Sequence, residues 1–191
     1  MCRSIFSRRP PEQVVGEALV PAPDPDHAWR LLSLVNEWIR HSDAKAGVTL
    51  AFAGVLATML FNLVGTYNKR TILFDVLVVV AVFLLVLTAG LCTWTLTPRL
   101  KDADAEPEAI SRIFFGSIAR NFKGARQQYR DALATLTIDP HKLVKDIADQ
   151  IHANSKIATV KALAAKRAIR SALGAGVFIA ALATIIGITN L

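Results

Sequence analysis

The sequence predicts an all-α integral membrane protein with three transmembrane helices and a cytoplasmic helical bundle continuous with spans one and three. The first observation is a set of three apolar runs at residues 46–65, 76–97 and 171–191. Each run is free of charged side chains and lasts about 20 residues, enough for a helix to cross roughly 30 Å of hydrocarbon. The second observation is that the polar remainder shows helical periodicity and no strong strand pattern.

The distribution of basic residues predicts the orientation in the membrane. The 191-residue chain has a net charge of +7 and a mean hydropathy of +0.40. Six Lys/Arg precede the first run, two lie in the turn 66–70, and fourteen lie between Pro98 and Arg170. The positive-inside rule therefore predicts a cytoplasmic N-terminus, a cytoplasmic middle segment and an external C-terminus. The basic excess favours contact with anionic lipid over binding to nucleic acid.

Two Asp-Pro pairs predict where the long helices begin. Asp24-Pro25 and Asp139-Pro140 each offer a capping carboxylate followed by Pro at the first helical position. No Gly or Pro follows Pro25 before Ala46, so one helix is expected to enter the first span. The predicted divisions are a disordered tail 1–25, a cytoplasmic helix 26–45, spans 46–65 and 71–97, a cytoplasmic helical region 98–170 and a span 171–191.

Within the middle region, residues 101–108 are acidic and contain Pro107, so they predict a linker. Residues 110–136 carry one apolar stripe at three- and four-residue steps, which predicts an amphipathic helix. Residues 143–170 continue the helical pattern directly into the third span. Helices continuous with spans would transmit a change in the bundle to the membrane as rigid rods.

Small residues recur at steps of three or four in two of the spans and permit close approach of helices. Two interpretations stay open, namely packing within one chain and self-association of several chains. These residues are Gly47, Ala51, Gly54 and Thr58 in the first span, and Ala172, Gly176, Ala180 and Thr184 in the third.

A polar cluster precedes the first span. Asn36, Arg40 and Asp43 share one helix face, and Lys45 follows at the mouth of the span. Arg or Lys would suit a phosphate and Asp43 a sugar hydroxyl or a base, so a small anionic ligand is one interpretation. A polar collar that reaches the lipid headgroups is the other.

A second polar group, residues 152–156, interrupts an apolar face in the helix before span three. It is either a solvated face or the group that meets Asp43 and Arg40 across the bundle. The candidate ligand-binding residues of both groups are Asn36, Arg40, Asp43, Lys45, Ser155 and Lys156.

The sequence predicts neither an enzyme nor a metal site. It contains no Ser/His/Asp order, nucleophile elbow, P-loop or dinucleotide-binding glycine pattern. No histidine is paired with another ligand type at i, i+4, and the two cysteines have no metal-binding spacing. We therefore expect no catalytic residues, no metal and no resident cofactor.

The run 36–47, Asn-Glu-Trp-Ile-Arg-His-Ser-Asp-Ala-Lys-Ala-Gly, leads directly into span one. It resembles the N-x-W-x-x-x-A/S-D-x-K-A signature of the Pycsar effector transmembrane family. Residues 113–118 and 149–157 are similar as well, as is the order of two spans, a helical stretch and one further span. The resemblance covers residues 28–191. The matching positions are Asn36, Trp38, Asp43, Lys45, Phe115, Gly116, Gln150, Ser155 and Lys156.

The resemblance implies a role in bacterial antiphage defence. A companion pyrimidine cyclase would make cyclic CMP or cyclic UMP, and the effector would respond by impairing the inner membrane and causing abortive infection. The chain has neither the room nor the strand pattern for a β-roll cyclic-nucleotide domain. Direct sensing would therefore fall to the helical bundle, either within one chain or between the subunits of an expected homo-oligomer.

The alternative function is a membrane anchor or scaffold whose bundle recruits a cytoplasmic partner. It predicts partner binding without a change in permeability. A small transporter fits the sequence poorly, because Asp75 is the lone ionisable residue near a span interior and ion pathways generally require such residues.

Overall fold

The computed structural model describes residues 22–67, 71–98 and 111–189. Every regular element within these ranges is a helix, in agreement with the predicted all-α class. The tail up to residue 21, the turn residues 68–70, the linker 101–108 and the last two residues lie outside the described ranges. The helices are α1 (Pro25–Thr66), α2 (Ile72–Leu96), α3 (Phe115–Asn121), α4 (Arg126–Ile138) and α5 (Pro140–Thr189).

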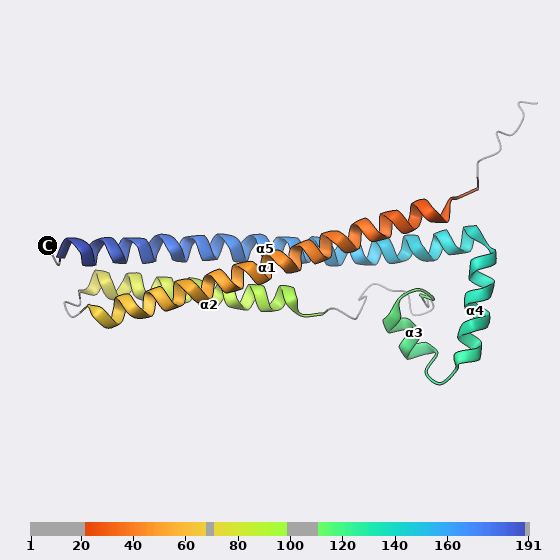
Figure 1. Cartoon of the computed structure of the whole chain (residues 1–191), viewed down its shortest axis with the longest axis horizontal. Helices are drawn as coiled ribbons and strands as arrows, with labels where there is room; N and C mark the ends of the chain where they lie inside the picture. Colours follow the sequence, from red (N-terminus) through yellow and green to blue (C-terminus); the bar gives the residue numbers. More distant parts are fainter. Residues whose placement is uncertain (1–21, 68–70, 99–110, 190–191) are drawn as a thin grey trace, which may run out of the picture.

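Helices α1 and α5 each run without a break from a polar half into an apolar half, as the sequence predicted (Figure 1). They contain 42 and 50 residues, lengths of about 63 and 75 Å at 1.5 Å per residue. Since the hydrocarbon core is roughly 30 Å thick, each helix extends well beyond it. With α2, they are the three helices long and apolar enough to cross a membrane in the described part of the chain.

Both predicted Asp-Pro helix starts are confirmed. The Asp24 side chain accepts a hydrogen bond from the backbone N–H of Asp26 at 2.9 Å. Asp139 accepts from the backbone N–H groups of His141 and Lys142 at 3.1 and 3.2 Å. The hydrogen bond from the Lys142 backbone is the main reason that the pKa of Asp139 lies below its usual value.

Buried residues of α5 recur at seven-residue spacing along the helix, except that Asn154, between Ile147 and Lys161, is half-buried. Helix α1 is parallel to α5 and α2 is antiparallel to both (Figure 1). Phe74, Ala81, Thr88 and Thr95 give α2 the same seven-residue period. This period is that of left-handed coiled coils, so one packing geometry runs through polar and apolar halves alike. The buried positions of α5 that follow it are Ile147, Lys161, Ala168, Ala175 and Leu182.

The apolar halves of α1, α2 and α5 pack around a shared core. It is formed by Ala53, Leu56, Leu60, Tyr67, Phe74, Ala81, Leu85, Ala175, Ile179 and Leu182. The Ser171 hydroxyl donates to the Leu84 carbonyl at 2.9 Å and ties α5 to α2. Ala172 is buried, and a Cβ added at Gly176 would lie 3.9 Å from a Leu56 methyl carbon. Packing within one chain is thus confirmed for these two small residues, and self-association stays a prediction.

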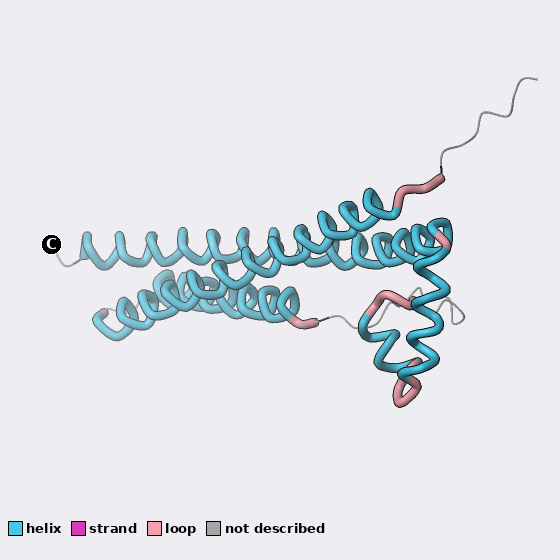
Figure 2. The backbone as a smooth tube through the Cα atoms, turned by 45° about the vertical axis from the view of Figure 1, so that its right-hand side comes forward, coloured by secondary structure: helices cyan, strands magenta, loops and turns pink. Residues whose placement is uncertain are grey.

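The prediction of a single amphipathic helix over residues 110–136 is wrong. Residue 110 lies outside the described residues, and the rest forms α3 and α4, separated by a turn. Gly124 in this turn has φ +75°, a left-handed conformation that glycine adopts without steric cost. The two short helices form an arm at the polar end of α5, and not a third rod of the bundle (Figure 2).

The segment 111–114 before α3 fastens this arm to α5. The Arg112 guanidinium donates two hydrogen bonds of 2.9 Å to the two carboxylate oxygens of Asp146. The hydrogen bond to Asp146 raises the pKa of Arg112. The next residue, Ile113, packs against the cluster of Ala28, Leu32 and Ile147 at the polar ends of α1 and α5.

Substitution of Gly124 by Ala is expected to loosen the arm. No atom lies within 4 Å of the added Cβ, so the cost comes from the positive φ alone and is about 1 kcal/mol. Hydrogen exchange of residues 115–138 should accelerate, whereas α1 and α5 should be unchanged. Gly47→Ala, helical and equally open, is the matched control and should not accelerate exchange. Unchanged exchange in Gly124→Ala would contradict the role of the turn.

Candidate functional site

The two long parallel helices are joined by two polar contacts in their polar halves. The Asn154 side-chain amide of α5 donates to the Asn36 side-chain oxygen of α1 at 2.8 Å. The Lys161 ammonium of α5 donates to both carboxylate oxygens of Asp43 in α1, at 2.6 and 2.9 Å. In each helix the two positions are seven residues apart. The contacts therefore repeat with the period of the packing and pin one register of α1 against α5.

Of the two contacts, the Asp43–Lys161 ion pair would cost more free energy to break. Lys161 is 5% exposed, while the Asp43 side chain remains about one-third exposed. A buried ammonium that loses its partner is costly, because water does not replace the lost interaction. The pair thus holds α1 and α5 together just before Ala46 and Ala168, which pack with Cys92 where the three apolar segments meet.

Further side-chain hydrogen bonds extend from the Asn36–Asn154 contact along α5. Gln150 donates to the Asn154 side-chain oxygen at 2.9 Å, and Ser111 donates to Gln150 at 3.4 Å. A hydrogen-bonded chain thus runs from the segment that carries the arm, through α5, to α1. We call Asn36, Asp43, Gln150, Asn154 and Lys161 the polar seam.

The structure places the first four predicted site residues in different environments. Asn36 and Asp43 are engaged in the polar seam. Arg40 and Lys45 are exposed. Two of the four side chains are therefore used in contacts between α1 and α5.

Of the second predicted group, Ser155 is half-buried and donates to the Ile151 carbonyl at 2.7 Å, and Lys156 is exposed. Of the two interpretations of residues 152–156, the one in which they contact Asp43 is wrong, since Asn154 contacts Asn36 and Asp43 pairs with Lys161. Sequence reasoning did not select Lys161. The available signal was its position seven residues after Asn154, on the buried face of α5.

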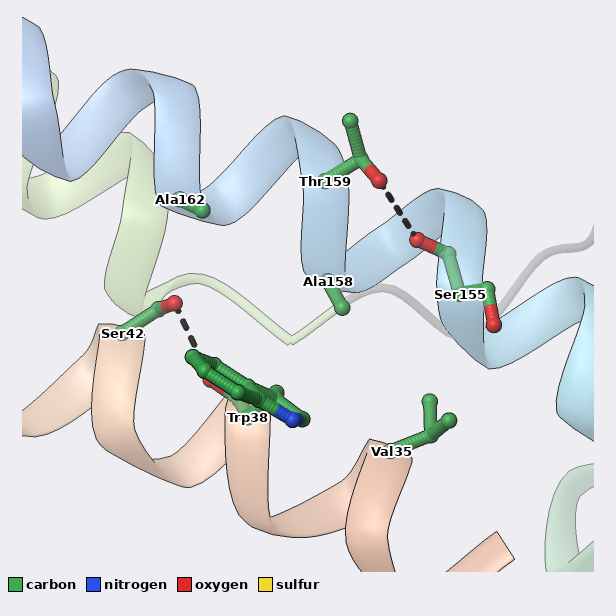
Figure 3. Close-up of a pocket in the computed structure, with 7 residues that line it drawn as sticks. All are labelled: Val35, Trp38, Ser42, Ser155, Ala158, Thr159 and Ala162. Atoms are coloured by element: carbon green, nitrogen blue, oxygen red, sulfur yellow. Dashed lines mark hydrogen bonds between the residues drawn. The ribbon is translucent and has the colours of Figure 1, made fainter. Parts of the chain in front are cut away.

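A groove beside the polar seam has the chemistry of a small-ligand site. It has a volume of about 290 Å³ and lies between α1 and α5 (Figure 3). Its wall is Trp38, which is 60% exposed, and its floor consists of small side chains. We call it the Trp38 groove; its lining residues are Val35, Trp38, Ser42, Ser155, Ala158, Thr159 and Ala162.

Hydroxyl groups supply the polar part of the Trp38 groove. Ser42 donates to the Trp38 carbonyl at 3.0 Å, and Thr159 donates to the Ser155 carbonyl at 2.9 Å (Figure 3). Because each hydroxyl proton is used within its own helix, the oxygen lone pairs are left to accept hydrogen bonds. An exposed indole ring with nearby acceptors suits a planar heterocycle that carries an amino or imino donor.

Comparison with known proteins identifies the family. The model of the Pycsar effector protein domain matches residues 27–188, which include the polar seam and the Trp38 groove. The chain belongs to the Pycsar effector family. A curated relative, Pycsar effector protein PtPycTM from Propioniciclava tarda, is 37% identical over 142 residues, covering 74% of this chain and 70% of the relative. No solved structure matches the chain significantly.

Membership confirms the resemblance inferred from the Asn36–Gly47 signature. Pycsar effectors of this type are membrane effectors and not known enzymes, and membership supports a role in Pycsar antiphage defence. The three apolar helices make this member a membrane protein.

The Asp43–Lys161 pair yields a stability prediction. Asp43→Leu leaves the Lys161 charge buried without its partner and should destabilise the protein by about 2 kcal/mol. Lys161→Met in the same chain removes that charge and should restore most of the loss. The midpoint of denaturant-induced unfolding in detergent, followed by circular dichroism, measures both. Arg40→Met, an exposed charge on α1, is the control and should change the midpoint little. A double variant as unstable as Asp43→Leu would contradict the prediction.

Proposed function

We propose that this chain is the membrane effector of a Pycsar system, which cyclic CMP or cyclic UMP activates to impair the membrane in which it lies. The observation that carries the proposal is the family match over residues 27–188, within helices that connect the Trp38 groove to two spans. A companion pyrimidine cyclase would supply the nucleotide. The chain itself would act by binding and not by catalysis.

The Trp38 groove is the proposed nucleotide site. A pyrimidine ring would stack on Trp38, and base–aromatic stacking contributes about 1–3 kcal/mol per base. The hydroxyl oxygens of Ser42 and Thr159 would accept hydrogen bonds from the base or the ribose. Neither Lys156 nor Lys45 lines the groove, and Lys156, which follows Ser155 in the chain, would bind the cyclic phosphate from its edge.

The polar seam supports a mechanism of coupling between this groove and the spans. Ligand that fills the Trp38 groove contacts α1 and α5 at once, so it would favour the arrangement of the two helices that fits it best. Asp43 and Lys161 adjoin the lining residues Ser42 and Ala162, at the end of the groove nearer the apolar halves of the same two helices. A change in the separation or register of α1 and α5 would therefore repack the spans.

Membrane damage by this route requires several copies. The apolar halves of one chain pack around a shared core of three helices, which are too few to enclose a sizeable pore. Ala180 and Thr184 of the small-residue stripe, together with Val177, are exposed and would be available for contacts between copies. We therefore propose that the active form is a homo-oligomer in the bacterial inner membrane, with the basic polar halves on the cytoplasmic side.

Dye release from proteoliposomes tests this function directly. Wild-type protein should release dye when cyclic CMP or cyclic UMP is added. Trp38→Ala should raise the nucleotide concentration for half-maximal release by about tenfold or more, because it removes the stacking surface.

The matched control is Trp29→Ala, which removes an indole of α1 that does not line the groove. It should leave the half-maximal concentration unchanged. Absence of release with wild-type protein at every concentration of both nucleotides would overturn the effector function and favour a membrane anchor. An equal effect of both substitutions would retain the function but remove the nucleotide from the Trp38 groove.

A further inference from the structure

A second groove, which differs from the Trp38 groove in having basic lining residues, adjoins it on the side nearer the membrane spans. It has a volume of about 410 Å³ and shares Trp38, Ser42 and Ala162 with its neighbour. Its other lining residues include three cations, Lys45 from α1 and Lys166 and Arg170 from α5. Ala165 and Ile169 provide an apolar floor. We call this the basic groove.

The charges of the basic groove are not neutralised within the described part of the chain. No Asp or Glu lines the groove. Lys45, Lys166 and Arg170 are exposed, and none of them is in an ion pair among the described residues. Three cations around a concave surface attract an anion more strongly than the same charges spread over a convex one. The groove is therefore suited to a phosphate.

The basic groove lies at the boundary of the hydrocarbon layer. Lys45 immediately precedes the first apolar run, and Arg170 immediately precedes the third. The neighbouring residues Ala46 and Ala168 pack with Cys92 at the level where all three apolar segments come together. Charges at this depth lie among the lipid headgroups, where Trp38 is also favoured.

An exposed apolar track continues from the basic groove along both helices. On α1, Val48 and Phe52 follow Lys45 by three and seven residues, and Val48 is 73% exposed. On α5, Leu173 and Val177 follow Arg170 by the same steps, and Leu173 is 59% exposed. Residues at these spacings share a helix face. The ligand that matches both surfaces has an anionic head joined to long apolar chains.

We propose that the basic groove is a binding site for an anionic phospholipid, such as phosphatidylglycerol. Arg170 would bind the phosphate in a bidentate manner, Lys45 and Lys166 would add charge, and the acyl chains would lie along the exposed track. A cyclic nucleotide has a phosphate but nothing to cover the track. The lipid would bridge α1 and α5 beside the Asp43–Lys161 pair. This site goes beyond the proposed nucleotide response and does not depend on it.

Native mass spectrometry of the full-length protein in detergent tests the site. Dioleoyl phosphatidylglycerol and dioleoyl phosphatidylcholine are titrated separately, and bound lipid is counted. Wild-type protein should bind phosphatidylglycerol more tightly than phosphatidylcholine. Lys166→Gln and Arg170→Gln should each weaken that binding about fivefold, the effect of one basic residue at an anionic headgroup. Binding of phosphatidylcholine should not change.

Arg167→Gln is the matched control, because Arg167 is exposed and adjacent to Lys166 but does not line the groove. It should leave lipid binding unchanged, with helix content checked by circular dichroism in every variant. Equal affinity for the two lipids, or an equal loss in Arg167→Gln, would overturn the proposal. Two competition experiments, one with cyclic CMP and one with inorganic phosphate, show whether the bound phosphate belongs to a lipid or to a soluble molecule. Displacement of phosphatidylglycerol by inorganic phosphate, or by cyclic CMP equally well in wild-type and Trp38→Ala protein, would assign the groove to a soluble phosphate and overturn the lipid site.

Discussion

The register of α1 against α5 is the constraint on which the rest of the structure depends. Hydrophobic contacts alone allow two long apolar helices to slide by a heptad, because each heptad buries a similar surface. The Asn36–Asn154 and Asp43–Lys161 contacts remove that freedom, since a slid arrangement would bury Lys161 without its carboxylate. Both grooves are lined from the two helices at once, so their shape follows from this register.

The placement of the polar contacts has a mechanical consequence. They lie in the polar halves, beyond the core that unites α1, α2 and α5 in the apolar halves. Helix α2 ends at Leu96, so α1 and α5 continue past it as a pair (Figure 1). A two-helix region held by few directional contacts has closely related alternative arrangements, whereas a packed three-helix core resists continuous deformation. The proposed response to a ligand would therefore fall on the two-helix end, while the three-helix end would move as a unit.

The arm joins the two-helix end through directional contacts as well. Arg112 pairs with Asp146, and Ser111 joins the hydrogen-bonded chain that reaches Asn36 through Gln150 and Asn154. The apolar contribution of Ile113 is small beside the core of the spans. A movement of the arm would therefore alter the hydrogen bonds of the polar seam before it altered the packing of the spans.

The sequence by itself determined the helical class, the three apolar spans and the two long helices that enter them. These follow from local rules, namely the length of an apolar run and the Asp-Pro caps at Asp24 and Asp139. The family signature around Asn36 and Asp43 was also legible without a structure. Tertiary structure alone decided the partners of those residues. In the sequence, Lys161 is one of many basic residues. The structure shows that the packing of α1 against α5 buries it beside Asp43. The turn at Gly124, which divides the amphipathic stripe, was also decided by the tertiary structure. Periodicity shows which face of a segment is apolar, but it does not show where the backbone turns.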